Sequence, residues 1–271
     1  MPAISAKMVM ELRDSTNLPM MKCKAALEQA NGDRDEAIKI LRQQGLAAKD
    51  KFAGRETPNG AIGMALKDGA GVLVLLGCQT DFVANSEEFI AAVGAIAKVA
   101  LDTGADSVDA VKGQQLNGGT VEETVTALIN KIRENIVLVK VTRVSGPTVV
   151  GYNHGGRIGA LVAGTNNAAN NLKTVALHIA SANPAPVSLT RGEVDPVLVD
   201  KEREILLALP EVLAKPEAMR PKIVEGKLGR FFKESVLLEQ EMLLENEKGE
   251  SVEKYAKRVG VEIAGFARLS V

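Results

Sequence analysis

The sequence predicts an α+β protein, and three observations support that prediction. Apolar residues recur with a helical period over the first 45 residues. Beyond residue 60, short segments with a period of two alternate with helical segments that begin at capping residues. Residues 195–233 are charged and helical in pattern, which is typical of an antiparallel helical hairpin. We therefore expect a small helical module, two blocks of strands and helices, and a projecting hairpin.

The first 45 residues are expected to form three short helices. The break at Asn17-Leu18-Pro19 separates the first helix from the second, because proline suits the first turn of a helix. The second helix places Met20, Cys23 and Leu27 on one stripe, so their spacing alone indicates core positions. The third helix is expected to close at Gly45, since glycine is the preferred residue just past a helix end.

Two blocks with small antiparallel sheets follow. In the first block, strands at 60–66 and 71–78 are joined by the turn Asp68-Gly69, and a third strand covers 136–144. Ser86 is expected to cap one helix of this block, and Thr120 with Glu123 forms a capping box for another. The second block is predicted to contain strands at 148–152, 158–163 and 261–271, and helices at 170–182 and from 251.

These patterns predict the domain organisation. A helical module covers 1–50, the first core block 51–145 and the second core block 146–271. The hairpin is inserted into the second block at about 187–235.

Composition excludes several classes of function. The net charge of −1 argues against a protein that binds nucleic acid through phosphates, because such proteins carry a basic excess. The longest strongly apolar run, 72–76, is far shorter than a membrane helix, and the first residues lack the apolar core of a signal peptide. We expect a cytoplasmic protein with reduced cysteines and no direct contact with nucleic acid or membrane.

Few residues of the sequence suit catalysis. The only histidines are His154 and His178, and His178 lies among apolar neighbours, which favours a structural role. Cys23 and Cys78 each lie within an apolar pattern and are expected to be buried. The sequence contains no cluster with metal-ligand spacing and no phosphate-binding glycine motif. We expect a protein that binds another protein, with no enzymatic activity, catalytic residue, metal or cofactor of its own.

One loop is chemically unusual. Thr80, Asp81, Phe82 and Val83 follow a predicted buried strand directly and precede the helix start at Ser86. Two interpretations of Phe82 stay open. It either folds back to plug the end of the sheet, or it stays exposed as an anchor for a partner.

Four segments together carry a resemblance to a known family. They are LRDSTNLPMMKCKAALEQANGDRDEAI, CQTDFVA, GYNHGGRIGALV and KIVEGKLGRFFKESVLLEQ. In this order and spacing, the chain resembles elongation factor Ts, the family of bacterial guanine-nucleotide exchange factors for elongation factor Tu, over essentially its whole length. The resemblance implies a three-helix module similar to ubiquitin-associated domains, a two-part core and a coiled-coil hairpin.

The resemblance also implies which residues contact the partner. Its exchange loop falls on Thr80, Asp81, Phe82 and Val83, which would enter the nucleotide domain of elongation factor Tu, displace Mg²⁺ and disturb the phosphate site. Further contacts carry over onto Arg13, Met20, Met21, Lys24, Ile132 and His154. Some family members continue into an additional C-terminal helix, so that contact is left open here. In different members the hairpin serves homodimerisation or partner contact, and both stay open.

Two other functions remain alternatives. One is an adaptor whose helical module binds peptides or ubiquitin-like folds, and the other is an enzyme that uses Cys78 or His154. An adaptor has no reason to carry the Asp81-Phe82 pair so far from its module. Replacing both cysteines tests the enzyme hypothesis, because nucleotide exchange does not need them.

Overall fold

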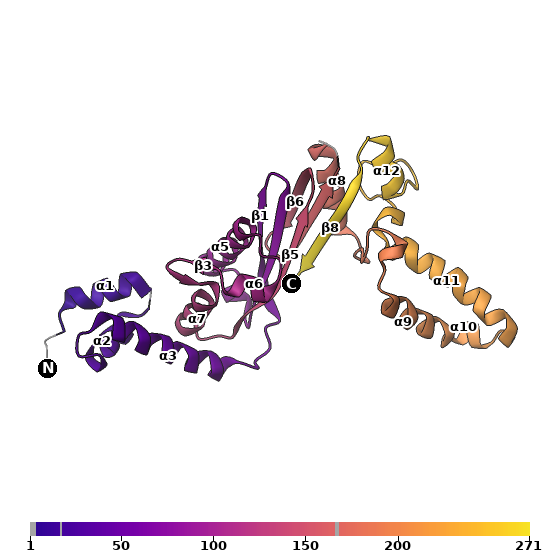
Figure 1. The fold of residues 1–271 in the computed structure, drawn as a ribbon. Helices are drawn as coiled ribbons and strands as arrows, with labels where there is room; N and C mark the ends of the chain where they lie inside the picture. The colour runs from indigo at the N-terminus through magenta and orange to yellow at the C-terminus, as the bar shows by residue number, and fades with distance from the viewer. Residues whose placement is uncertain (1–3, 17, 166–167) are drawn as a thin grey trace.

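A computed structural model describes residues 4–16, 18–165 and 168–271, and it confirms the α+β class. The chain begins with three helices, α1 (Ala6–Thr16), α2 (Met20–Gln29) and α3 (Arg34–Phe52), which lie at one end of the molecule in Figure 1. Leu12, Cys23 and Leu27 are fully buried in the small core that these helices share. The three helices of this unit were therefore predicted correctly, with one exception in their bounds.

The exception is the end of the third helix, because α3 does not stop at Gly45 but continues to Phe52. Gly45 lies inside α3 against α7 (Val121–Ile132), where a Cβ atom would meet Asn130 Nδ2 at 2.6 Å. Glycine is used here for close helix packing, so its sequence pattern suggested a stop that does not occur. Arg42 and Glu123 form an ion pair across the same contact, at 3.4 Å.

The first sheet has the antiparallel order β1-β2-β5, with β1 at Asn59–Lys67, β2 at Ala70–Cys78 and β5 at Ile136–Ser145. The β1–β2 turn occurs as predicted, and Gly69 has the positive φ of 76° that this turn needs. Helix α5 (Glu87–Thr103) covers one face of this sheet, and Ser86 caps it. The predicted capping box at the start of α7 is also present. Short elements complete the block: α4 (Asp81–Ala84), α6 (Val108–Lys112), β3 (Gln115–Leu116) and β4 (Gly119–Thr120).

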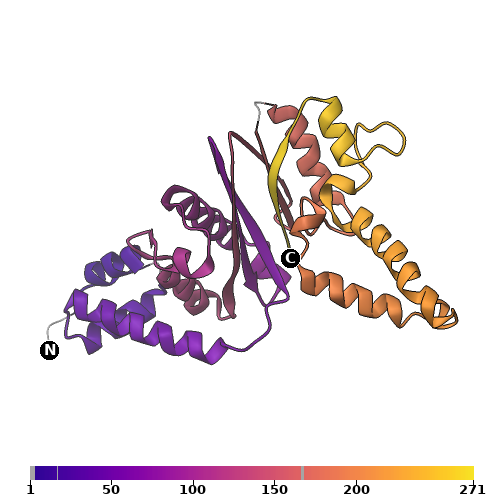
Figure 2. The same ribbon diagram turned by 45° about the vertical axis from the view of Figure 1, so that its right-hand side comes forward.

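The second sheet has the order β6-β7-β8, with β6 at Thr148–His154, β7 at Ile158–Gly164 and β8 at Ile263–Ser270. Helix α8 (Ala169–Ser181) covers its outer face, and α12 (Val252–Arg258) packs beside it. The inner face packs on the first sheet through a shared apolar cluster that includes Leu73 and Leu161. The two sheets therefore stand face to face with helices outside them, as Figure 2 shows.

The predicted helical hairpin is present as an arm of its own (Figures 1 and 2). Helix α9 (Pro196–Leu207) leads outward, α10 (Pro210–Leu213) makes the corner and α11 (Arg220–Ser235) returns. Leu206, Val212, Val224 and Leu228 form its small buried core. Three single turns of 3-10 helix flank these helices: η1 (Arg191–Glu193), η2 (Glu217–Met219) and η3 (Leu237–Glu239).

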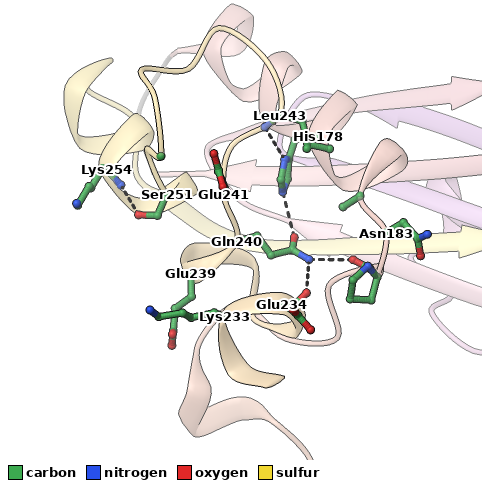
Figure 3. A pocket seen from close by; sticks show the side chains of 13 residues that line it. His178, Asn183, Lys233, Glu234, Glu239, Gln240, Glu241, Leu243, Ser251 and Lys254 are labelled. Carbon is green, nitrogen blue, oxygen red and sulfur yellow. Dashed lines mark hydrogen bonds between the residues drawn. The ribbon is translucent and has the colours of Figure 1, made fainter. Parts of the chain in front are cut away.

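His178 connects α8 to the base of this arm, beside a pocket of about 560 Å³ that Figure 3 shows. Its side chain is only 1% exposed. His178 Nδ1 accepts a hydrogen bond from the Leu243 amide (3.3 Å), and Nε2 lies 3.0 Å from Gln240 Oε1. Gln240 Nε2 in turn donates to the carbonyls of Pro184 and Glu234, at 2.9 and 2.7 Å. The structural role expected for His178 is confirmed, because both ring nitrogens are occupied.

This arrangement predicts a pH dependence of stability. Burial lowers the pKa of His178, so the folded protein keeps this ring neutral at a pH where the unfolded chain binds a proton. The free energy of unfolding should therefore fall as the pH drops below about 6.5, by up to about 1.4 kcal/mol per pH unit from this group. Urea unfolding at pH 7.5 and 5.5 tests this, with His178→Gln as the control. The prediction would be contradicted if the free energy of unfolding of His178→Gln fell as much between pH 7.5 and 5.5 as that of the parent.

Candidate partner-binding site

The segment from Thr80 to Val83 is a single helical turn and not the irregular loop that the sequence suggested. It begins where β2 ends, and α4 covers Asp81–Ala84. Thr80 is the N-cap, because its hydroxyl accepts a hydrogen bond from the Val83 amide (3.4 Å). Asn85 closes the turn by donating from its side chain to the Asp81 carbonyl (2.8 Å). The turn therefore has caps at both ends.

Phe82 projects into solvent, with 86% of its surface exposed. The hypothesis that it plugs the end of the sheet is therefore wrong. One turn of helix directs consecutive residues to different sides, so Ala84 is buried and Val83 packs against the first core while Asp81 and Phe82 face outward. A free protein gains nothing from exposing an aromatic ring, which makes Phe82 the leading candidate for a binding anchor.

Glu134, which sequence reasoning missed, holds this turn in place. Its Oε2 accepts hydrogen bonds from the amides of Gln79 (3.2 Å) and Thr80 (3.1 Å), and its Oε1 accepts from the Thr80 hydroxyl (2.7 Å). The adjacent backbone is tied as well, since the Asn135 amide donates to Gln79 Oε1 (2.9 Å). No local pattern in the sequence indicates this role, because the Thr80 groups that Glu134 binds lie 54 residues away.

Ile132 and His154, the other two core residues in the expected contact set, lie at the same end of the sheets. Ile132 ends α7 two residues before Glu134 and packs, half-buried, against the first core. His154 ends β6, is exposed, and has its Nδ1 2.9 Å from the Tyr152 hydroxyl. The turn after His154 is docked on β1, because the Ile62 amide donates to the Gly156 carbonyl (2.7 Å).

The four expected contact residues of the module are all exposed. Met20 is 48% exposed and Met21 73%, while Arg13 and Lys24 are also on the surface. The core position inferred for Met20 from its spacing is therefore wrong. Burial, and after it the charge of Arg133, lowers the pKa of neighbouring Lys22, so α2 lies within electrostatic range of the end of α7.

Neither cysteine is arranged for chemistry. Cys23 and Cys78 are both free and fully buried, as expected. Burial, and then the charge of Glu134, raises the pKa of Cys78 to about 11, so its thiol stays protonated at neutral pH. Its Sγ donates to the Thr80 carbonyl, at 3.2 Å. Among the described residues no group of three or more His, Cys, Asp or Glu is placed to hold a metal ion.

We expect the double variant Cys23→Ala, Cys78→Ala to fold and to keep its function. Each change deletes one buried sulfur, and each should lower the free energy of unfolding by about 1 kcal/mol. In the parent, both thiols should resist a thiol-specific reagent until the protein is unfolded. A folded double variant that has lost its activity on a partner would contradict this prediction.

No helix in the described part of the chain is long and apolar enough to cross a membrane.

Fold and site together define a class: an α+β protein that presents an exposed aromatic on a clamped helical turn, next to a helical module with exposed methionines. The family model described as elongation factor TS matches residues 79–271. The chain is 41% identical to elongation factor Ts of Dinoroseobacter shibae over 275 residues, which cover 99% of this chain and 92% of that protein. It is 40% identical to the elongation factors Ts of Paracoccus denitrificans and Psychrobacter cryohalolentis, covering 92% and 90% of those proteins. The chain belongs to the elongation factor Ts family.

Proposed function

We propose that this protein is the guanine-nucleotide exchange factor for elongation factor Tu in protein synthesis. It binds the complex of elongation factor Tu with GDP and promotes the release of GDP. Family membership supports this function. The observation that carries it is the exposure of Phe82 on a turn whose backbone Glu134 clamps.

The proposed mechanism is a rigid wedge. Thr80, Asp81, Phe82 and Val83 enter the nucleotide domain of the partner beside the phosphates of GDP. Mg²⁺ requires near-ideal octahedral geometry, so a shift of about an ångström in the surrounding helices weakens metal and phosphate contacts together. A turn that is already ordered loses little conformational entropy on binding, which leaves more of the contact energy for this distortion.

Exchange by this route involves no proton transfer and no covalent step, so the protein acts without catalytic residues, metal or cofactor of its own. The coupling is reciprocal. If this protein weakens GDP binding by some factor, GDP weakens the binding of this protein by the same factor.

The module is proposed to supply affinity. In this proposal residues 1–50 form a unit similar to ubiquitin-associated domains, and Arg13, Met20, Met21 and Lys24 form its contact patch. Ile132 and His154 extend the wedge contact on the core, which divides at 51–145 and 146–271. The coiled-coil hairpin at about 187–235 serves homodimerisation or partner contact. No part of this binding mode uses nucleic acid or membrane.

A protein-binding adaptor without exchange activity is the second candidate. The observation that favours it is the exposure of Met20 and Met21, at 48% and 73%. Flexible methionine side chains suit surfaces that accept several partners. Such an adaptor would bind through the module alone and would not need Phe82.

Release of fluorescent GDP from elongation factor Tu separates the two candidates. We expect this protein to accelerate release in proportion to its concentration until the complex saturates. The matched control is release in the presence of an equal concentration of the Phe82→Ala variant. Binding to elongation factor Tu without any acceleration of release would favour the adaptor and contradict the exchange function.

A further inference from the structure

A second pocket lies beside His154, on the outer face of the second sheet. Cross-strand pairing places Tyr152, Ala160 and Arg268 in one row, and His154, Ile158 and Ser270 in the next. Side chains two residues apart along a strand point to the same face of the sheet. For these two rows it is the face that α8 covers. Helix α8 ends at Ser181, and a pocket of about 460 Å³ remains between its end and these rows.

Arg268 is the charged group of this pocket. It is half-buried, and burial alone lowers the pKa of its guanidinium. Its Nε donates to the Ile179 carbonyl in the last turn of α8 (3.2 Å), and its Nη1 donates to the Ser270 hydroxyl (3.3 Å). Within the described chain, no carboxylate pairs with Arg268, and its Nη2 has no hydrogen-bond partner.

Other polar side chains also line the pocket. They are the imidazole of His154, the amide of Asn183, and the hydroxyls of Tyr152 and Ser181, and no acidic residue is among the lining residues. Figure 3 shows the Asn183 side chain directed away from His178. If the Tyr152 hydroxyl donates to His154 Nδ1, the remaining ring nitrogen of His154 is a donor as well. The pocket thus offers a cation and several donors to an anion, with alanine and isoleucine side chains around them.

We propose that this pocket receives an aspartate or glutamate side chain of the protein partner, with Arg268 as its counter-ion. The planar fork of N–H donors on a guanidinium matches the two oxygens of a carboxylate. The alanine and isoleucine side chains would surround the methylene groups of that residue. The partial negative charge at the carbonyl end of α8 disfavours an anion. Arg268 offsets that charge, because its Nε donates a hydrogen bond to the Ile179 carbonyl.

The position of the pocket indicates a protein carboxylate as the occupant, because His154 lines the pocket and also lies at the end of the sheets that carries Phe82. A partner engaged by Phe82 and His154 therefore brings its own surface over the pocket mouth. This inference rests on the proposed function, which identifies that partner as elongation factor Tu.

Two variants test the pocket, and a third is their control. Asn183→Asp introduces a carboxylate of this chain into the lining of the pocket that Arg268 also lines, with almost no change in the size of the side chain. Arg268→Gln removes the charge but keeps a donor for the Ile179 carbonyl. Arg143→Gln is the matched control, because Arg143 also donates to a carbonyl in the last turn of a helix, from its Nη1 to Leu101 (3.4 Å), but it is not among the residues that line this pocket.

Binding to elongation factor Tu should weaken by about tenfold or more in both pocket variants and by less than about twofold in Arg143→Gln. Added salt should weaken the parent complex more than the variant complexes. Parent-like binding by Asn183→Asp would overturn the inference. Weak binding by Arg268→Gln would then mean only that Arg268 supports the folded structure.

Inorganic phosphate supplies a further test. If phosphate raised the melting temperature of the parent but not of Arg268→Gln, while both pocket variants bound normally, the pocket would take a free anion and the inference would be wrong.

Nucleotide release by the parent separates this inference from the proposed function. If the parent fails to accelerate GDP release, the exchange function fails. If the parent accelerates release and both variants bind like the parent, only the pocket inference fails.

Discussion

Phe82→Ala should slow the release of GDP from elongation factor Tu by roughly 30-fold to 1,000-fold at a fixed, subsaturating concentration of this protein. An aromatic anchor that fills a pocket on a partner is worth about 2–4 kcal/mol, which corresponds to that range. The ring is 86% exposed in the free protein, so its truncation removes few internal contacts. The free energy of unfolding should therefore change by no more than about 0.5 kcal/mol. Both quantities are measured on one sample, by a melting curve and a release assay.

Phe89→Ala is the matched control for this experiment. Phe89 lies seven positions further along the chain and is 0% exposed in the first core. Its truncation should cost about 3–5 kcal/mol of stability. If Phe82→Ala lost as much melting temperature as Phe89→Ala and still released GDP normally, Phe82 would be a core residue and the wedge mechanism would be wrong.

Glu134→Ala should reduce exchange although Glu134 itself is not expected to touch the nucleotide. The change leaves the amides of Gln79 and Thr80 and the Thr80 hydroxyl without their acceptor. Donors that lose a partner cost about 1–3 kcal/mol of stability, and the released turn must then be ordered during binding. We expect the exchange rate to fall by about tenfold, since 1.4 kcal/mol of ordering free energy has that effect.

Two comparisons distinguish positioning of the wedge from general damage. Glu134→Gln keeps the shape but places an NH₂ group where one of the two acceptor oxygens was, so its exchange rate should lie between those of parent and Glu134→Ala. In a Phe82→Ala background the Glu134→Ala change should have little further effect on exchange, because there is no anchor left to position. Full additivity of the two changes would show that Glu134 acts independently of the wedge.

Elements whose signals are local could be predicted from the sequence. Ser86 caps its helix, and Thr120 with Glu123 forms a capping box, because the partners in each case lie within four residues of one another. The turn between β1 and β2 could be predicted because it needs a residue with positive φ, and glycine, here Gly69, adopts that conformation readily. Local hydrogen bonds and backbone sterics act over a few residues, so a single sequence is enough to predict their outcome.

Other features depended on contacts between distant segments. Gly45 has the pattern of a helix stop, yet α3 continues through it because α7 packs closely there. Met20 has the spacing of a core residue and is 48% exposed. Periodicity identifies an apolar stripe but not how much of it the neighbouring helices will bury.

The candidate site shows the same division. The position of Thr80, Asp81, Phe82 and Val83 between a buried strand and a helix was readable from the sequence, as was the unusual presence of an aromatic there. Whether Phe82 points in or out was not, because that depends on a one-turn helix held by Glu134 from another segment, 54 residues from Thr80. Only the tertiary structure brings a carboxylate to those amides, and hydrogen bonds between distant segments leave no local pattern in the chain.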